Sequence, residues 1–238
     1  MKKIRALHSW IDNLPPDIRE AVVQRMRTRH YGDGEAVYML GEEGHELYMV
    51  ASGKIRSSNY TLRGKEIQYA VLQAGDCFGE LSLIDGLCRV HSTYAQGPAD
   101  LLVLHKRDFD ELYTTYPEIP VQINKLLSCR LRIAHTTVDE ATALSMNDRL
   151  ARLLGRLAYS VGVEDEHGAT VLEGFTHQNL ARMLGSNREG ISRELKKLEE
   201  AGLLRRSYGR VEIPDINSLI GSCDGLVGGE QLVPDYHS

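Results

Sequence analysis

Two charged residues, Glu80 and Arg89, stand in the stretch from Gly75 to Thr93, whose other residues mostly favour burial. A guanidinium group forms strong, charge-assisted hydrogen bonds with anions, whereas a carboxylate accepts hydrogen bonds from nearby donors. The two side chains therefore have two interpretations. They bind a small anionic ligand, or they form a partly buried structural ion pair at the edge of a β-domain.

A second group of residues suited to recognition chemistry lies between Thr176 and Ile213. The pattern predicts a helix capped by Thr176, a tight turn at Gly185 and a second helix capped by Ser186 or Asn187. The apolar residues expected on the buried faces of these two helices are Leu180, Met183, Leu184, Ile191, Leu195 and Leu198.

The outer side of the second helix is expected to carry Arg188, Glu189, Ser192 and Arg193 near its N-terminus. In helix-turn-helix proteins this part of the recognition helix contacts base edges. An arginine can hold guanine O6 and N7 with two hydrogen bonds, and a glutamate can accept one from cytosine N4. The alternative is a solvated ion pair between Glu189 and Arg193, but that does not account for a glycine turn between two capped amphipathic helices.

The surroundings of these helices are basic, although the whole chain has a formal net charge of −5. Residues 176–210 contain eight arginines and lysines but only four glutamates. Phosphate contacts fix the register of a protein on DNA and make binding salt-sensitive without reading sequence. The hairpin LLRRSYGRVEI, with its turn at Tyr208-Gly209, is expected to form a wing against the DNA backbone. Candidate phosphate contacts are Thr176, Ser186, Lys196, Lys197, Arg205, Arg206 and Arg210.

The elements that precede this region follow from apolar periodicity and turn residues. Residues 30–105 read as short alternating strands separated by glycines, which predicts an antiparallel β-roll or barrel. A short helix opened by Pro15 and Pro16 comes before it. From Pro117 to about Leu144 apolar residues recur every three or four positions, which predicts one long helix. Such a helix either forms a coiled-coil dimer seam or packs on its own roll.

A further helix is expected to begin with Asn147 as its N-cap. The break before it, ALSMN, is the expected domain boundary and hinge. The predicted fold class is α+β: an N-terminal antiparallel β-roll, a long dimerisation helix and a C-terminal winged helix-turn-helix. The expected limits are 1–116 for the roll, 117–146 for the long helix and hinge, 147–220 for the DNA-binding domain and 221–238 for a loose tail.

The composition excludes several classes of protein. The 238 residues are 42% apolar and 26% charged, as in ordinary soluble proteins. The chain has no run of about 18 apolar residues, and MKKIRALHSW lacks the apolar core of a signal peptide, so we expect a cytoplasmic protein with no membrane partner. No nucleophile with a base, metalloprotease motif or phosphate-cradling loop is present, so we expect no enzyme.

The cysteines do not form a metal-binding or disulfide pattern. Cys77, Cys88, Cys129 and Cys223 include no C-x-x-C pair, which argues against a zinc ribbon and against a stapled secreted fold. We therefore expect no metal site and reduced, mostly buried thiols.

From about Leu14 to Ile213 the chain resembles the bacterial transcription regulators typified by the cyclic-AMP receptor protein and FNR. Gly75-Asp76-Cys77-Phe78-Gly79-Glu80-Leu81-Ser82-Leu83 followed by Arg89 is similar to the cyclic-nucleotide-binding roll of this family. Asn187-Arg188-Glu189-Gly190-Ile191-Ser192-Arg193 is similar to its recognition helix.

The resemblance implies a homodimer joined by the helix from Pro117 to Leu144, with two recognition helices in successive major grooves of a palindromic DNA site. Because Arg188, Glu189 and Arg193 match the family's base-reading residues, the implied half-site is TGTGA or a near relative. Double-stranded DNA, a second copy of the chain and RNA polymerase are the implied partners.

The resemblance also implies roles in an effector pocket. Glu80 would accept a hydrogen bond from a ribose 2′-hydroxyl, Arg89 would pair with a cyclic phosphate, and backbone N–H groups near Gly79 would add donors. Effector binding would then shift the dimer helix and hinge between two states. The other residues of the implied pocket are Leu81, Val90, His91, Ala134 and His135.

Several of these positions depart from the family's pattern. Cys88, Val90 and His91 stand where a proline, a hydroxyl residue and a small residue are usual. On the long helix, Ala134 and His135 replace the threonine and serine of cyclic-AMP binders, although Thr136 and Thr137 are close by.

The effector therefore stays open between cyclic AMP or a related cyclic nucleotide, a cyclic dinucleotide, a metabolite, haem, a redox signal and none. His91 and His135 are available as haem ligands, whereas an FNR-like iron–sulfur cluster needs N-terminal cysteines and the first cysteine is Cys77. An alternative function is a cyclic-nucleotide-binding module that acts on a protein partner.

Overall fold

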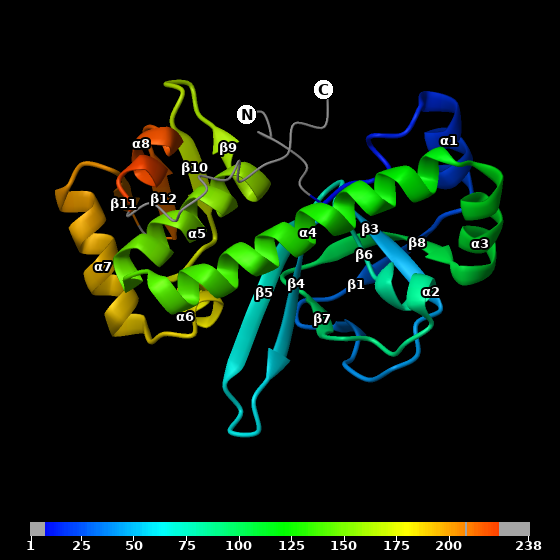
Figure 1. The fold of residues 1–238 in the computed structure, drawn as a ribbon, viewed down its shortest axis with the longest axis horizontal. Coiled ribbons are helices and arrows are strands. Elements are labelled where there is room, and N and C mark those ends of the chain that lie inside the picture. Colours follow the sequence, from blue (N-terminus) through cyan, green and yellow to red (C-terminus); the bar gives the residue numbers. More distant parts are fainter. Residues whose placement is uncertain (1–7, 208, 224–238) are drawn as a thin grey trace. The chain divides into compact units, whose positions relative to one another are not determined.

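The computed structural model describes residues 8–207 and 209–223. The chain divides into two compact units, whose described parts are residues 8–128 and 129–223. The division falls inside the long helix α4 (Glu118–Ala143), which is drawn in green in Figure 1. Each unit is described separately below.

The first unit contains two four-stranded antiparallel sheets, which confirm the predicted β-roll. One sheet has the strand order β1-β8-β3-β6 and the other β2-β7-β4-β5. The strands are β1 (Arg27–Tyr31), β2 (Ala36–Tyr38), β3 (Glu46–Ser52), β4 (Lys54–Tyr60), β5 (Glu66–Gln73), β6 (Cys77–Phe78), β7 (Ser92–Ala95) and β8 (Ala99–His105).

Aromatic side chains fill the roll between these strands. The rings of Tyr48 and Phe78 stack with centroids 5.1 Å apart, and Tyr38 packs against both. A second apolar cluster joins the roll to α1 (Pro16–Gln24), α3 (Lys106–Thr115) and the start of α4. The short helix α2 (Leu81–Asp85) follows β6. Pro15 and Pro16 stand at the start of α1, as the sequence predicts.

The two halves of α4 have different environments. Ile119, Ile123 and Leu126 are buried in the apolar cluster with α1 and α3. Farther along, Leu131 and Val138 are 58% and 65% exposed, although they lie seven residues apart on one face of the helix. The N-terminal half therefore packs on its own roll, and the C-terminal half leaves an apolar face open.

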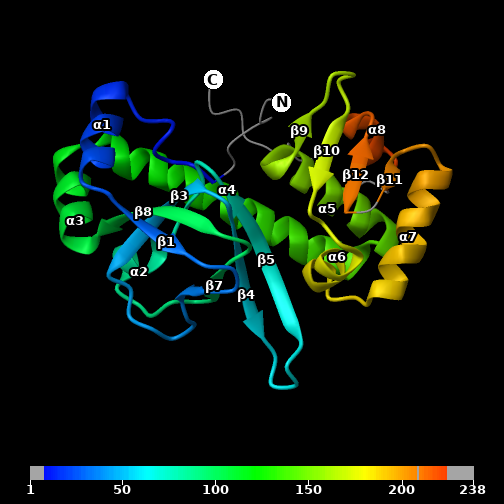
Figure 2. The same cartoon turned by 180° about the vertical axis from the view of Figure 1, so that it is seen from behind.

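The second unit contains the predicted helix-turn-helix, with α6 (His177–Leu184) followed by Gly185 and α7 (Arg188–Glu200) (Figure 2). A four-stranded antiparallel sheet in the order β11-β12-β10-β9 accompanies it. The other elements are α5 (Met146–Val161), β9 (Val163–Glu164), β10 (Thr170–Glu173), β11 (Arg205–Ser207), β12 (Arg210–Ile213) and α8 (Ile216–Gly221).

The predicted N-cap of α5 is wrong by two residues. Ser145 caps this helix, because its Oγ accepts a hydrogen bond from the backbone N–H of Asp148 and donates one to the Asp148 carboxylate. This exchange satisfies an N–H group of the first turn. The side chain of Asn147 instead donates to Glu194 Oε2 at 3.1 Å.

The buried face of α6 and the extent of the wing sheet differ from the predictions. Met183 is only half-buried, and Ala181 takes its place in the core because it lies on the face shared by Leu180 and Leu184. The wing hairpin β11–β12 is extended by β10 and β9, so it belongs to a larger sheet than the sequence indicates. Tyr208 and residues 224–238, which include most of the predicted tail, lie outside the described residues.

None of the helices described for this chain is long and apolar enough to span a bilayer.

Candidate DNA interface and effector pocket

The local sequence sets the position of the recognition helix α7. Thr176 and Asn179 form a reciprocal capping box at the start of α6. Gly185 adopts a φ of +65°, in the left-handed region that glycine occupies without strain, so the chain turns sharply there. Asn187 then caps α7, with its Oδ1 accepting a hydrogen bond from the N–H of Gly190 at 2.7 Å.

One face of α7 is buried and the other is open. Ile191, Leu195 and Leu198 are at most 2% exposed and pack within this unit, where α7 contacts α5 and α6. Because their spacing occupies a single face of the helix, the opposite face is presented to solvent.

The predicted base-reading residues lie on the open face. Arg188, Glu189 and Arg193 are exposed, and Ser192 is half-buried. Within the part of the chain that the structure describes, none of the three charged side chains forms an ion pair, so the alternative Glu189–Arg193 pair is absent. Their donors and acceptors are available to another molecule.

The candidate phosphate contacts differ in the interactions that they form within the protein. Thr176 is engaged in its capping box, and Ser186 is half-buried beside the turn. Lys196 pairs with Glu200 at 3.5 Å and Lys197 with Glu194 at 3.0 Å. These lysine pairs are exposed and therefore contribute little to stability.

The arginines of the wing are also paired with glutamates. Arg205 bonds Glu212 at 3.0 Å. Arg206 donates to Glu199 through Nε at 2.9 Å and through its backbone N–H at 3.0 Å. Arg206 thus holds β11 against the C-terminal end of α7, which is a structural role that the sequence did not indicate.

His177 is a further residue of this surface that the sequence pattern missed. It is the first residue of α6, and burial together with the charges of Arg206 and Arg188 lowers its pKa below the usual value. His177 lies on α6, and the two arginines that act on it lie on α7 and β11. They are distant in sequence, so only the folded unit shows that they interact.

Arg89 is a buried cation in the first unit. Its side chain donates from Nη1 to the carbonyl of Gly79 and from Nη2 to the carbonyl of Glu46, both at 2.6 Å. The residue is 5% exposed, and its guanidinium carbon lies 4.3 Å from the centre of the Tyr38 ring. Among the described residues, no acceptor forms a hydrogen bond with Nε of Arg89.

The second interpretation of Glu80 and Arg89, a structural ion pair, is not met in the described chain. Glu80 is 1% exposed at the start of α2, but the guanidinium group is directed to backbone carbonyls instead. Gly79 makes this possible: its φ is +88°, and a Cβ atom there would lie 3.1 Å from Nη1 of Arg89. The loop therefore brings its carbonyl onto the arginine at a position that only glycine suits.

The other predicted pocket residues do not all gather around Arg89. Leu81 is half-buried and Val90 is 52% exposed. The ring of His91 lies beside Tyr38 and is 3.3 Å from its hydroxyl group. Ala134 and His135 are exposed on α4 and belong to the other unit.

A row of buried polar residues on the β2-β7-β4-β5 sheet was not found from the sequence. Ser92, Ser58 and Gln68 are direct cross-strand partners on neighbouring strands, so they face the same side of the sheet. Ser58 and Gln68 are 0% and 3% exposed. Neither the hydroxyl of Ser58 nor either amide atom of Gln68 has a hydrogen-bond partner among the described residues. Such groups are costly to bury unless another molecule completes them.

The described residues include potential metal-binding side chains and the cysteine thiols. No group of three or more metal-binding side chains occurs in the described residues. All four cysteines are free; Cys77 and Cys129 are buried, Cys223 is half-buried, and Cys88 is exposed, contrary to the expected burial. Burial raises the pKa of the Cys77 thiol to about 12, which keeps it protonated and unreactive.

Comparison with known proteins gives two domain matches. Residues 28–116 match the cyclic nucleotide-binding domain, and residues 148–221 match the Crp-like helix-turn-helix domain. These ranges contain the site around Arg89 and the recognition helix α7, respectively.

Individual relatives match most of the chain. The cyclic AMP receptor protein of Thermus thermophilus is 32% identical over 200 residues, covering 84% of this chain and 89% of that protein. The c-di-GMP responsive global regulator CLP of Xanthomonas campestris has a TM-score of 0.70 at 25% identity, covering 84% of this chain and 100% of the other. FixK2 of Bradyrhizobium japonicum shares the fold, with a TM-score of 0.74 at 17% identity over 85% of this chain and 99% of its own.

Proposed function

The chain belongs to the bacterial transcription regulators typified by the cyclic-AMP receptor protein and FNR, and on that premise we propose that it is a homodimer that reads palindromic DNA under effector control. The family consists of transcription regulators, which confirms the prediction that the chain is not an enzyme. In this proposal the limits are 1–116 for the effector roll, 117–146 for the dimerisation helix and hinge, and 147–220 for the DNA-binding domain.

The observation that carries the DNA-reading proposal is the open face of α7. Arg188, Glu189 and Arg193 are exposed near a helix N-terminus that is fixed by a cap and by a buried opposite face. Arginine and glutamate side chains presented in this way read guanine and cytosine in the major groove. We therefore propose a half-site of the TGTGA type.

The test is a binding assay with fluorescent duplexes that carry every single-base change in one TGTGA half-site. The proposal expects discrimination at the positions that the three residues contact. Equal losses for all sequences on removing Arg188, Glu189 and Arg193 in turn would contradict base reading. A failure to retard duplex DNA even at low salt would favour the alternative, a module that acts on a protein partner.

The exposed apolar face of α4 supports the dimer. Leu131 and Val138 lie seven residues apart and are more than half exposed, and Ala134 and Ala141 are exposed between and beyond them. A heptad spacing of this kind is typical of a two-helix seam. Sedimentation equilibrium is expected to give a dimer for the full chain and a monomer for Leu131→Glu.

The surroundings of Arg89 support an anionic effector. A buried guanidinium group with no carboxylate partner is destabilising unless an anion completes it. The proposed pocket places the anion at Arg89 and the rest of the ligand toward Ser58 and Gln68, whose polar atoms lack partners among the described residues. A cyclic nucleotide has both a phosphate and a hydrogen-bonding base.

A cyclic dinucleotide is the second candidate. Val90 and His91 stand where a hydroxyl and a small residue would serve a cyclic-AMP phosphate, and one solved relative is described as responsive to c-di-GMP. Calorimetric titration with cyclic AMP, cyclic GMP and cyclic di-GMP, after a visible spectrum for haem, decides between these effectors. If none of the three nucleotides gives a heat of binding and the spectrum shows no haem band, control by these nucleotides is contradicted.

Two further parts of the proposal follow from membership of the family. A regulator of this kind acts on transcription, so RNA polymerase is the proposed protein partner, and the proposed location is the cytoplasm. Co-purification of RNA polymerase on a promoter fragment that carries the TGTGA-type site, compared with a scrambled site, tests the partner.

A further inference from the structure

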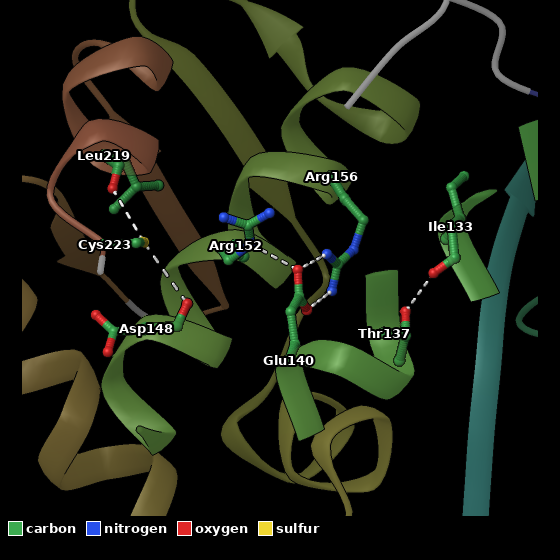
Figure 3. A network of polar contacts seen from close by, with 8 residues as sticks. All are labelled: Ile133, Thr137, Glu140, Asp148, Arg152, Arg156, Leu219 and Cys223. Atoms are coloured by element: carbon green, nitrogen blue, oxygen red, sulfur yellow. Dashed lines mark hydrogen bonds and ion pairs between the residues drawn. The ribbon is translucent and has the colours of Figure 1, made fainter. Parts of the chain in front are cut away.

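A buried charge cluster joins the end of α4 to α5. Glu140 on α4 accepts hydrogen bonds from Nε of Arg152 at 2.7 Å and from both terminal nitrogens of Arg156 at 2.6 and 2.8 Å (Figure 3). Both oxygens of the carboxylate are therefore engaged. We call these three residues the Glu140 clamp.

The clamp is shielded from water. The side chains of Glu140, Arg152 and Arg156 are 2%, 10% and 12% exposed. The two arginines lie four residues apart, on one face of α5, so both can reach the same carboxylate. Removing Glu140 would leave two buried cations without a counterion, whereas an exposed pair would lose little.

The same helix α5 is bonded to the DNA-reading helices. Arg149 donates to the carbonyl of Leu184, the last residue of α6, at 3.0 Å. Asn147 donates to the side chain of Glu194 on α7 at 3.1 Å. A continuous path of polar contacts thus leads from α4 through α5 to both helices of the helix-turn-helix.

The division of the chain agrees with this path. The C-terminal half of α4, from Cys129, falls in the same compact unit as the DNA-binding helices, although the helix is interrupted between α4 and α5. The break that the sequence marks as a hinge is therefore spanned by the clamp.

We infer that Glu140 is a positioning residue for DNA binding. Through Arg152 and Arg156 it fixes the direction of α5, and with it the recognition helix, relative to the C-terminal half of α4. If α4 is the dimer seam, this direction sets the distance between the two recognition helices and so the spacing of half-sites that the dimer accepts. The inference rests on the proposed dimer in this respect.

The test compares palindromes that differ only in half-site spacing. Binding of the full chain is measured by fluorescence anisotropy for the best spacing and for duplexes one base pair longer or shorter. Each series is run without nucleotide, with saturating cyclic AMP and with saturating cyclic di-GMP. The wild type is expected to prefer one spacing. Glu140→Gln is expected to reduce this preference by about fivefold or more, while single half-site affinity stays unchanged.

Two further variants keep the result interpretable. Asp139→Asn removes a neighbouring exposed carboxylate of α4 and is expected to keep the wild-type spacing preference. Arg156→Lys keeps the charge but loses the two-pronged contact, and it is the milder variant should Glu140→Gln not fold. A spacing preference unchanged in both clamp variants, with stability lowered, would make Glu140 merely structural and overturn the inference.

A measurement without DNA separates this inference from the proposed dimer. Hydrogen–deuterium exchange is expected to quicken across residues 140–150 in Glu140→Gln but not in Asp139→Asn, and unchanged exchange there would overturn the clamp. If the wild type shows no spacing preference, the palindromic dimer is contradicted. The hydrogen–deuterium exchange result then tests the Glu140 clamp independently of the dimer.

Discussion

The two sites of this regulator hold their arginines in opposite ways. On α7, Arg188 and Arg193 project from the open face of a helix whose other face is buried. Arg89 is 5% exposed and bonds to carbonyls of Gly79 and Glu46, the latter 43 residues away in sequence. A site built on one helix can thus be interpreted from local sequence, whereas a site built between strands cannot.

Among the substitutions considered, the removal of the buried Arg89 is expected to have the largest effect. Arg89→Ala should weaken the binding of the nucleotide that calorimetry identifies by about 30-fold or more, because losing one partner of a buried charge contact costs about 2–5 kcal/mol. Calorimetry measures the change, and circular dichroism checks that the roll remains folded. Saturating nucleotide should restore only part of the DNA binding of the Arg89→Ala variant.

Leu87→Ala is the control for this variant. Leu87 lies two residues before Arg89 but is 66% exposed and is not one of the pocket residues, so its truncation should alter nucleotide affinity by less than about threefold. If nucleotide binding survives Arg89→Ala, the phosphate does not bind to this arginine and the effector binds elsewhere in the roll.

Substitutions on α7 test the exposed arginines of the DNA-reading site. Arg188→Ala should relax discrimination at one base pair of the half-site by about 1–3 kcal/mol, because one two-pronged contact with guanine is lost. Lys196→Ala should weaken all sequences alike and reduce the salt dependence of log K by about one unit. Anisotropy with single-base variants at several salt concentrations measures both effects, and equal behaviour of the two variants would contradict the assignment.

Much of the fold follows from short-range signals. Proline at the start of α1, glycine at position 185 and the caps Thr176 and Asn187 act within a few residues, so their consequences are readable in sequence. The misplaced cap of α5 shows the limit of this approach. Ser145 and Asn147 are both good caps, and the contact of Ser145 with Asp148 decides between them.

The candidate sites were predictable to different degrees. The open face of α7 needed only the spacing of Ile191 and Leu195. The row formed by Ser58 and Gln68 depends on the register of two strands, and this register includes a bulge. Sequence periodicity indicates which strands exist but not which residues stand opposite each other, so these contacts required the folded chain.

The capping box of α6 is expected to contribute a smaller, structural effect. Thr176→Ala removes the acceptor for the N–H of Asn179 and should lower stability by about 1 kcal/mol. Thr176→Ser keeps the hydroxyl and should retain most of this stability. Thermal unfolding followed by circular dichroism measures the difference, and equal melting of the two variants would show that the cap is not limiting.

The smallest predicted effect is a pH dependence of DNA binding. In the free protein the pKa of His177 is lowered by burial and by Arg206 and Arg188, so the ring is neutral near pH 7. DNA phosphates would offset these positive charges and raise the pKa, so binding would be accompanied by proton uptake. Affinity should therefore rise a few-fold as the pH falls from about 7.5 to about 5.5. His177→Gln should flatten this slope in anisotropy titrations, whereas a slope that persists in the variant would assign the proton to another group.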